Sequence, residues 1–181
     1  LSFLAAFLAY LSANEALHLF KNAQALENLH RVDTVVLDKT GTLTTGKPEV
    51  TDILPGALTE DALLRLAAGL EAPSEHPFAK AILEKYGTAV LPEITDFETI
   101  PGRGVAATID GVRCFGGNAQ LMREQGIAVP ELPELASQGK TPLYFGSAQK
   151  GYLGAVAAAD VLKADSAEAV HALRSQGLQV V

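Results

Sequence analysis

Apolar residues dominate the beginning of the chain. Residues 1–11 are apolar almost throughout, whereas a membrane-spanning helix needs about 20 apolar residues. This run is too short to span a membrane alone, so it is either the last part of a span that begins upstream or a buried helix of a soluble domain. In residues 14–29 apolar side chains recur at helical spacing with polar ones between them, which predicts an amphipathic connector helix.

A β-branched run comes next. Residues 32–37 predict a buried strand that ends at Asp38, and residues 46–48, Gly-Lys-Pro, then interrupt any regular element. At the other end of the chain, residues 166–175 predict a helix and residues 178–181 a strand. Strands and helices in this order are typical of a parallel α/β sheet.

The middle of the chain has a different pattern. Two helices are predicted, one from Thr59 to about Leu70 and one over residues 78–86 with Pro77 at its start. Residues 96–117 form short alternating runs around Asp110-Gly111, a strong hairpin signal. Further elements are expected as strands at 49–54, 143–145 and 152–157 and as a short helix at 119–125. The simplest account is an α/β domain interrupted by an inserted α+β domain with antiparallel strands.

Composition narrows the choice of partners. The 181 residues are 48% hydrophobic, which is enough for one or two domains with real cores. The net charge is -7 and the 14 Lys and Arg residues are scattered, so we expect no nucleic-acid partner. The single cysteine, Cys114, fits a reducing compartment and excludes a thiolate-rich metal site. Metal chemistry must therefore use oxygen ligands or lie outside this chain.

The segment DKTGTLT, residues 38–44, follows the first predicted strand. The carboxyl end of a strand is where α/β sheets place ligand sites. A carboxylate at this place can attack the γ-phosphorus of ATP and form an aspartyl-phosphate. We therefore predict Asp38 as the nucleophile, Lys39 and Thr40 as further catalytic residues, and a Mg²⁺ site that uses Asp38 and Thr40. Gly41 lets the backbone come close to the phosphate.

Thr40 also indicates the type of reaction. A phosphatase built on this loop would gain from a second acid two residues after the nucleophile, to protonate the leaving group and then activate water. Threonine cannot do acid–base work near neutral pH. The phospho-aspartate is therefore expected to persist, as the intermediate of an ion pump must.

These seven residues resemble, without a mismatch, the phosphorylation signature of the P-type ATPases. The segment Ser-Glu-His-Pro at 74–77 resembles a motif of their heavy-metal-transporting branch. This resemblance implies that His76, Glu71 and the loop Gly102-Arg103-Gly104 hold the adenine end of ATP, with Gly116 and Gly117 as a further glycine site. Imidazole can lie against a purine and donate a hydrogen bond, and a carboxylate can accept one from the exocyclic amine.

The same resemblance implies the organisation of the whole chain. It assigns 1–30 to the end of a transmembrane helix and a connector, 31–48 and 151–181 to a haloacid-dehalogenase-like phosphorylation domain, and 49–150 to a nucleotide-binding domain. Asp160 and Lys163 resemble the return into the phosphorylation domain, although Val161 departs from the usual Pro or Thr. The segments that complete the Mg²⁺ site and name the transported ion are expected outside residues 1–181, which leaves the phosphorylation domain incomplete.

The implied function is ATP-driven transport of a heavy-metal cation by an integral membrane protein, with this segment mainly cytoplasmic and with ATP and Mg²⁺ as cofactors. Copper is a common cargo of the branch, but the metal cannot be read here. Two alternatives are a haloacid-dehalogenase-superfamily phosphatase or phosphotransferase and a non-catalytic nucleotide-binding module. Thr40 and the Ser-Glu-His-Pro segment argue against the first, and the latter also argues against potassium- and calcium-type pumps.

Overall fold

The structure is a computed structural model, and it describes residues 31–181. The predictions for residues 1–30 lie outside this part of the chain. The described residues form two compact units, one of residues 38–166 and one of residues 31–37 together with 167–181. Within the described range, no helix has the length and apolar character that crossing a membrane requires.

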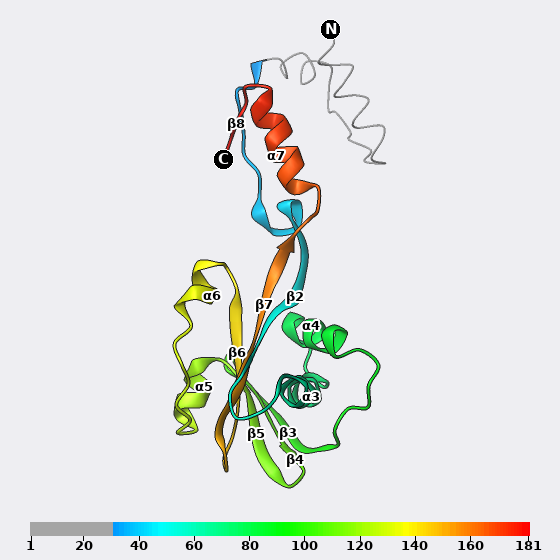
Figure 1. Cartoon of the computed structure of the whole chain (residues 1–181), viewed down its shortest axis with the longest axis vertical. Coiled ribbons are helices and arrows are strands. Elements are labelled where there is room, and N and C mark those ends of the chain that lie inside the picture. Colours follow the sequence, from blue (N-terminus) through cyan, green and yellow to red (C-terminus); the bar gives the residue numbers. More distant parts are fainter. Residues whose placement is uncertain (1–30) are drawn as a thin grey trace. The chain divides into compact units, whose positions relative to one another are not determined.

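The larger unit is built on a six-stranded sheet (Figure 1), in which every neighbouring pair is antiparallel. Its strands follow the order β2-β7-β6-β5-β4-β3. Their bounds are β2 Thr44–Pro55, β3 Ile94–Ile100, β4 Gly104–Ile109, β5 Val112–Gly117, β6 Thr141–Ser147 and β7 Gly151–Leu162. Between β4 and β5, Asp110 and Gly111 both have positive φ, 50° and 74°, as a type I′ turn requires. The predicted hairpin is confirmed.

Helices cover both faces of this sheet. Helices α3 (Glu60–Glu71) and α4 (Pro77–Tyr86) pack on one face, and α5 (Ala119–Glu124) and α6 (Pro133–Ser137) lie on the other (Figure 1). Thr59 caps α3 by accepting a hydrogen bond from the Ala62 amide, as its sequence predicts. The five-residue helix α6 was not expected, because so short a segment has no measurable helical period.

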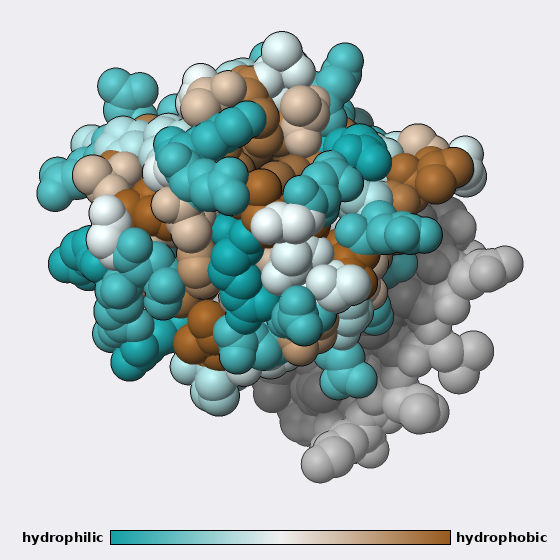
Figure 2. Space-filling model, turned by 90° about the horizontal axis from the view of Figure 1, so that it is seen from below, coloured by the Kyte–Doolittle hydropathy of each residue, from teal (hydrophilic) through white to brown (hydrophobic). Residues whose placement is uncertain are grey.

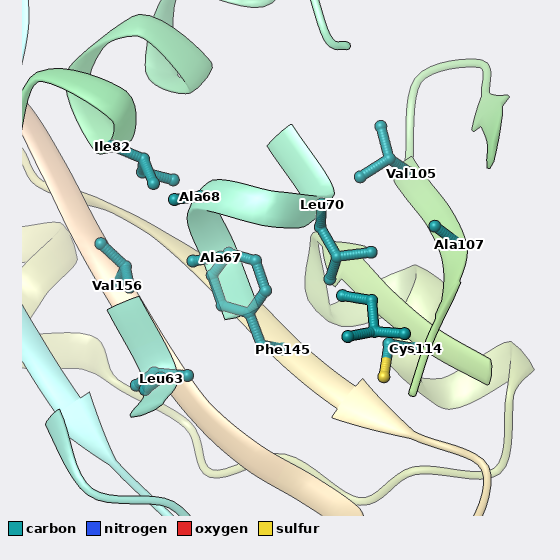
Figure 3. Close-up of a cluster of buried hydrophobic side chains, with 11 residues drawn as sticks. Leu63, Ala67, Ala68, Leu70, Ile82, Val105, Ala107, Cys114, Phe145 and Val156 are labelled. Atoms are coloured by element: carbon teal, nitrogen blue, oxygen red, sulfur yellow. The ribbon is translucent and has the colours of Figure 1, made fainter. Parts of the chain in front are cut away.

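The core lies in two layers because side chains on a strand alternate between faces. On one face, Leu63, Leu70 and Ile82 of the helices pack against Phe145 and Val156 of the sheet (Figure 3). The opposite face is a second cluster, formed mainly by Ala106, Phe115, Leu121, Met122, Ile127, Tyr144 and Ala155. Over the surface seen in Figure 2, mostly hydrophilic residues separate small hydrophobic areas. Most large apolar side chains of this unit thus lie in or against the two clusters, and Val90, Leu91 and Leu162 are exposed exceptions.

The smaller unit contains two short strands and most of one helix. Strand β1 (Thr34–Val35) pairs in parallel with β8 (Gln179–Val180), and α7 (Ser166–Ser175) precedes β8. The helix α7, the strand β8 and the parallel pairing are as predicted. Residues 32–37, however, do not form a buried strand. Val36 is 78% exposed and Val32 is 42% exposed. Among residues 31–181, β8 is the sole strand beside β1, so no second neighbouring strand covers these side chains.

One further expectation differs from the structure. The segment 46–48 does not end the regular structure, because β2 continues through it with a register shift between Thr44 and Pro48 and with Gly46 at φ 71°. The compact units are divided after residues 37 and 166, and β7 belongs to the larger one because it pairs with β2 and β6 along its length. The assignment of functional domains to residues 31–48, 49–150 and 151–181 stays a prediction.

Candidate functional site

A pocket of about 310 Å³ opens at one end of the larger unit's helices and sheet. It gathers four of the residues that the sequence singled out, namely Glu71, His76, Gly102 and Gly104. These residues come from the end of α3, the start of α4 and the turn before β4. Its remaining lining consists of Ser74, Thr99, Ile100, Arg103, Val105, Asn118, Thr141, Pro142 and Leu143. Segments far apart in the sequence therefore share one cavity.

Glu71 is a buried acid in this pocket. It is the last residue of α3 and only 3% exposed. Burial raises the pKa of its carboxyl group above the ordinary value, and a hydrogen bond with Ser74 acts in the opposite direction. The pocket thus holds a hydrogen-bonding group with little access to water.

His76 caps the N-terminus of α4. Its Nδ1 accepts a hydrogen bond from the Phe78 amide at 3.2 Å, so the proton of the neutral ring is on Nε2. The ring also makes a T-shaped contact with the Phe78 ring, with centroids 5.1 Å apart and planes at 68°. Since the His76 side chain is exposed, Nε2–H is free to donate to a ligand.

The Gly102 turn is held by Asn118, which lies between β5 and α5. The Arg103 amide donates to the Ile100 carbonyl at 3.0 Å, and Gly102 has φ 69°, as the third position of a type II turn requires. Asn118 donates from Nδ2 to the Gly102 carbonyl at 3.0 Å and from its amide to the Arg103 carbonyl at 2.9 Å. Its Oδ1 also caps α5. From the sequence, Gly116 and Gly117 of this segment were singled out and the Asn118 side chain was given no role, although an Asn before a helical segment is a capping signal.

Three of the predicted glycines are explained by strand packing. Gly104 and Gly117 are opposite each other in the β4–β5 pair. A Cβ on Gly104 would lie 2.0 Å from the Gly116 carbonyl oxygen, and one on Gly117 would lie 2.1 Å from the Arg103 carbonyl oxygen. A Cβ on Gly116 would lie 2.8 Å from the Phe145 ring. Gly116 and Gly117 do not line the pocket; Gly117 allows the strand that carries Gly104 to approach closely, and Gly116 leaves room for the Phe145 ring.

Asp38, Lys39 and Thr40 are exposed at the start of the larger unit. The loop that follows, Lys39–Leu43, has helix-like hydrogen bonding with an extended Thr40 and with Gly41 at φ 77°. The Gly41 amide donates to Thr44 Oγ1 at 3.1 Å. This arrangement leaves the Asp38 carboxyl group open to a ligand.

Asp160 and Lys163 meet this loop from β7 and the segment after it. Asp160 accepts hydrogen bonds from the Thr44 hydroxyl and from the Gly46 amide, the latter at 2.9 Å. Lys163 Nζ donates to the Gly41 carbonyl at 3.0 Å. The buried Thr44 and also Ser166, which donates to the Leu43 carbonyl at 2.7 Å, were not selected from the sequence. Hydrogen bonds thus hold the loop of residues 39–46 and the segment of residues 160–166 together.

The oxygen donors of the loop fit Mg²⁺. Asp38 supplies an exposed carboxylate, and Thr40 lies two residues further along. Mg²⁺ usually keeps several waters and takes one or two carboxylates together with phosphate oxygens. Residues 31–181 hold no cluster of three or more His, Cys, Asp or Glu side chains that could bind a metal by themselves.

Comparisons with known proteins show the family of the chain. Residues 32–181 match the family model of the haloacid dehalogenase-like hydrolases. The chain is 40% identical over 169 residues to a copper-exporting P-type ATPase of Staphylococcus saprophyticus. The matched region covers 90% of this chain and 21% of the relative. The chain therefore spans about a fifth of the length of that curated relative.

Solved structures give the same picture. A zinc-transporting PIB-type ATPase matches with a TM-score of 0.76 and 35% identity, over 90% of this chain and 27% of the other. The N-domain of a copper-transporting P-type ATPase matches with a TM-score of 0.50 and 26% identity, over 61% of this chain and 96% of that domain.

Proposed function

Since the chain belongs to the haloacid dehalogenase-like hydrolase family, we propose that it is the ATP-using part of a heavy-metal P-type ATPase. Its relatives include a copper-exporting and a zinc-transporting ATPase of this class. The proposed activity is transport of a heavy-metal cation across a membrane, driven by ATP through an aspartyl-phosphate on Asp38. In that protein this segment faces the cytoplasm. The metal is assigned only as a class, because the relatives differ in it.

The observation that carries the proposal is the pocket that gathers Glu71, His76, Gly102 and Gly104 in the same unit as Asp38. We infer that adenine binds there. His76 Nε2–H is available to donate to a purine nitrogen, and the Glu71 carboxylate, when ionised, can accept from the exocyclic amine. Glycine at 102 keeps the rim open, since a Cβ there would meet nothing within 4 Å.

At the loop, phosphoryl transfer follows from the chemistry of Asp38. A carboxylate oxygen attacks the γ-phosphorus, the bond to the bridging oxygen breaks, and ADP leaves with that electron pair. Water later cleaves the acyl phosphate, which restores Asp38 and releases phosphate. Lys39 offsets the negative charge, and Asp38 and Thr40 would hold Mg²⁺. When bound, this ion neutralises phosphate charge.

Thr40 favours a pump over a phosphatase. Its side chain is exposed beside Asp38 and cannot supply a proton or activate water near neutral pH. The aspartyl-phosphate consequently lasts long enough to be coupled to ion movement.

Phosphorylation from ATP tests the proposal. The chain would replace the matching 169-residue segment of the copper-exporting relative, and the product would be incubated with ATP labelled on the γ-phosphate. We expect a labelled protein that is stable in acid and cleaved by hydroxylamine, with no label after Asp38→Asn. Asp33→Asn, an exposed neighbour, is the control and should keep the label. Label on the Asp38→Asn protein would contradict the proposal. So would a wild-type exchanged protein that binds ATP but takes up no label.

A further inference from the structure

Phe78 differs from the other large apolar side chains of α4. It is the second residue of that helix and half-buried. Ile82, Leu83 and Tyr86 of the same helix pack in or against the larger core cluster, whereas Phe78 is in neither cluster. Its aromatic contact is with the ring of His76. The core therefore does not account for a phenylalanine at this position.

Phe78 contacts His76 in two ways. Its amide donates to His76 Nδ1 at 3.2 Å, which fixes the ring nitrogen that accepts and leaves the proton on Nε2. Its ring meets the imidazole in a T-shaped arrangement at 5.1 Å, a favoured geometry for aromatic pairs. The first contact belongs to the backbone and survives a change of side chain, but the second depends on the aromatic ring.

An exposed imidazole with only one hydrogen bond can still tilt about its χ2 axis, because this torsion has a broad energy profile. The Phe78 ring restricts that tilt by occupying one side of the imidazole. The plane of His76 and the direction of Nε2–H are then set before any ligand arrives. A site organised in advance loses less conformational entropy on binding.

We propose that Phe78 is a positioning residue for the nucleotide site. Its ring holds the His76 imidazole in the orientation in which Nε2–H can donate to adenine. The inference rests on the proposed function, because it assumes that His76 contacts the base. Phe78 itself need not touch the nucleotide.

The test measures dissociation constants for ATP and ADP by calorimetry on the 181-residue chain. Phe78→Leu should weaken binding about threefold to tenfold, the range expected from one aromatic pair. Phe78→Tyr keeps the ring and should bind as the wild type does. Phe97→Leu is the matched control, since Phe97 is also half-buried but packs against the core and does not line the pocket. It should leave the affinity unchanged.

A double-mutant cycle with His76→Ala separates this inference from the proposed function. His76→Ala alone should weaken binding, and adding Phe78→Leu should then have no further effect, because the residue through which Phe78 acts is gone. If His76→Ala binds as tightly as the wild type, the adenine site itself is wrong. If His76→Ala weakens binding but Phe78→Leu does not, the adenine site stands and the positioning role fails.

The His76 ring signals in NMR spectra show whether the two rings contact each other in solution. In Phe78→Leu the ring-carbon protons of His76 should shift because the aromatic neighbour is lost, while amide spectra elsewhere stay the same. Phe78→Met serves in the same way if the leucine variant does not fold. Unchanged His76 ring signals in a folded variant would overturn the proposal.

Discussion

At the scale of single residues, Glu71 combines burial with a hydrogen-bonding role. An acid that loses contact with water at the end of a helix favours its neutral form, since the charged form is poorly solvated there. This burial raises the carboxyl pKa in the folded protein. Glu71 therefore lowers stability at neutral pH, a cost that is typical of residues kept for ligand binding.

We predict that Glu71→Gln increases the free energy of unfolding at neutral pH. Well below the ordinary carboxyl pKa, Glu71 is protonated in both the folded and the unfolded wild type. The variant then differs little from the wild type in its free energy of unfolding. As pH rises past that value the unfolded wild type loses its proton before the folded one does, so wild-type stability falls, and the fall ends above the raised folded pKa. Urea unfolding between about pH 4 and pH 8 measures this difference.

Glu84→Gln, an exposed change on α4, is the control and should show a much smaller change with pH. A stability difference between wild type and Glu71→Gln that does not grow as pH rises would contradict this account. Glu71→Gln should also bind ATP more weakly than the wild type if the wild-type carboxylate accepts a hydrogen bond from the base.

At the scale of elements, the strand pair β4–β5 forms the rim of the pocket. The type I′ turn fixes the register in which Gly104 is opposite Gly117. At that point the two backbones leave no room for side chains. Asn118, immediately after β5, then holds the Gly102 turn. The pocket depends on this register as much as on the residues that line it.

We predict different costs for alanine at the two predicted pocket glycines. Gly104→Ala places a Cβ 2.0 Å from the Gly116 carbonyl oxygen, so it should cost about 3 kcal/mol or more of stability. Gly102→Ala meets no atom within 4 Å but has φ 69°, so it should cost about 1 kcal/mol. Thermal and urea unfolding compare the two. Equal costs would show that strand contact does not explain Gly104.

At the scale of the whole molecule, the two units differ in how much of their sheet is buried by packed side chains. The larger unit has a six-stranded sheet with a hydrophobic cluster on each face. Within the described residues the smaller unit has a two-stranded sheet whose strands are two residues long. Stability within a protein follows buried contacts and protected backbone hydrogen bonds.

Hydrogen exchange should therefore divide the chain in the same way. Amides of β4, β5, β6 and β7 should exchange slowest, and those of β1, β8 and α7 should exchange much faster. ATP should slow exchange around residues 71–78 and 102–104 if these residues bind it. Mass spectrometry of peptides measures both effects. Equal protection of β8 and β6 would contradict the difference in burial.

The sequence by itself determined most elements and the family. Thr59, Pro77 and the Asp110-Gly111 turn specify their elements by local hydrogen bonding and backbone geometry, which a short stretch of chain contains in full. The resemblance drawn from residues 38–44 and 74–77 is confirmed by relatives that are heavy-metal P-type ATPases, and the fold class by the family match. The roles of the site residues stay predictions.

Only the tertiary structure decided which residues meet. Asp160 reaches Thr44 across 116 positions of the chain, and Asn118 reaches Gly102 across 16. The packing of Gly104 on Gly117, the isolation of Phe78 from the core and the exposure of Val36 likewise depend on partners far away in the sequence. Local patterns fix φ, ψ and caps, but burial and long-range hydrogen bonds arise only once the sheet has assembled, because they belong to pairs of segments rather than to one.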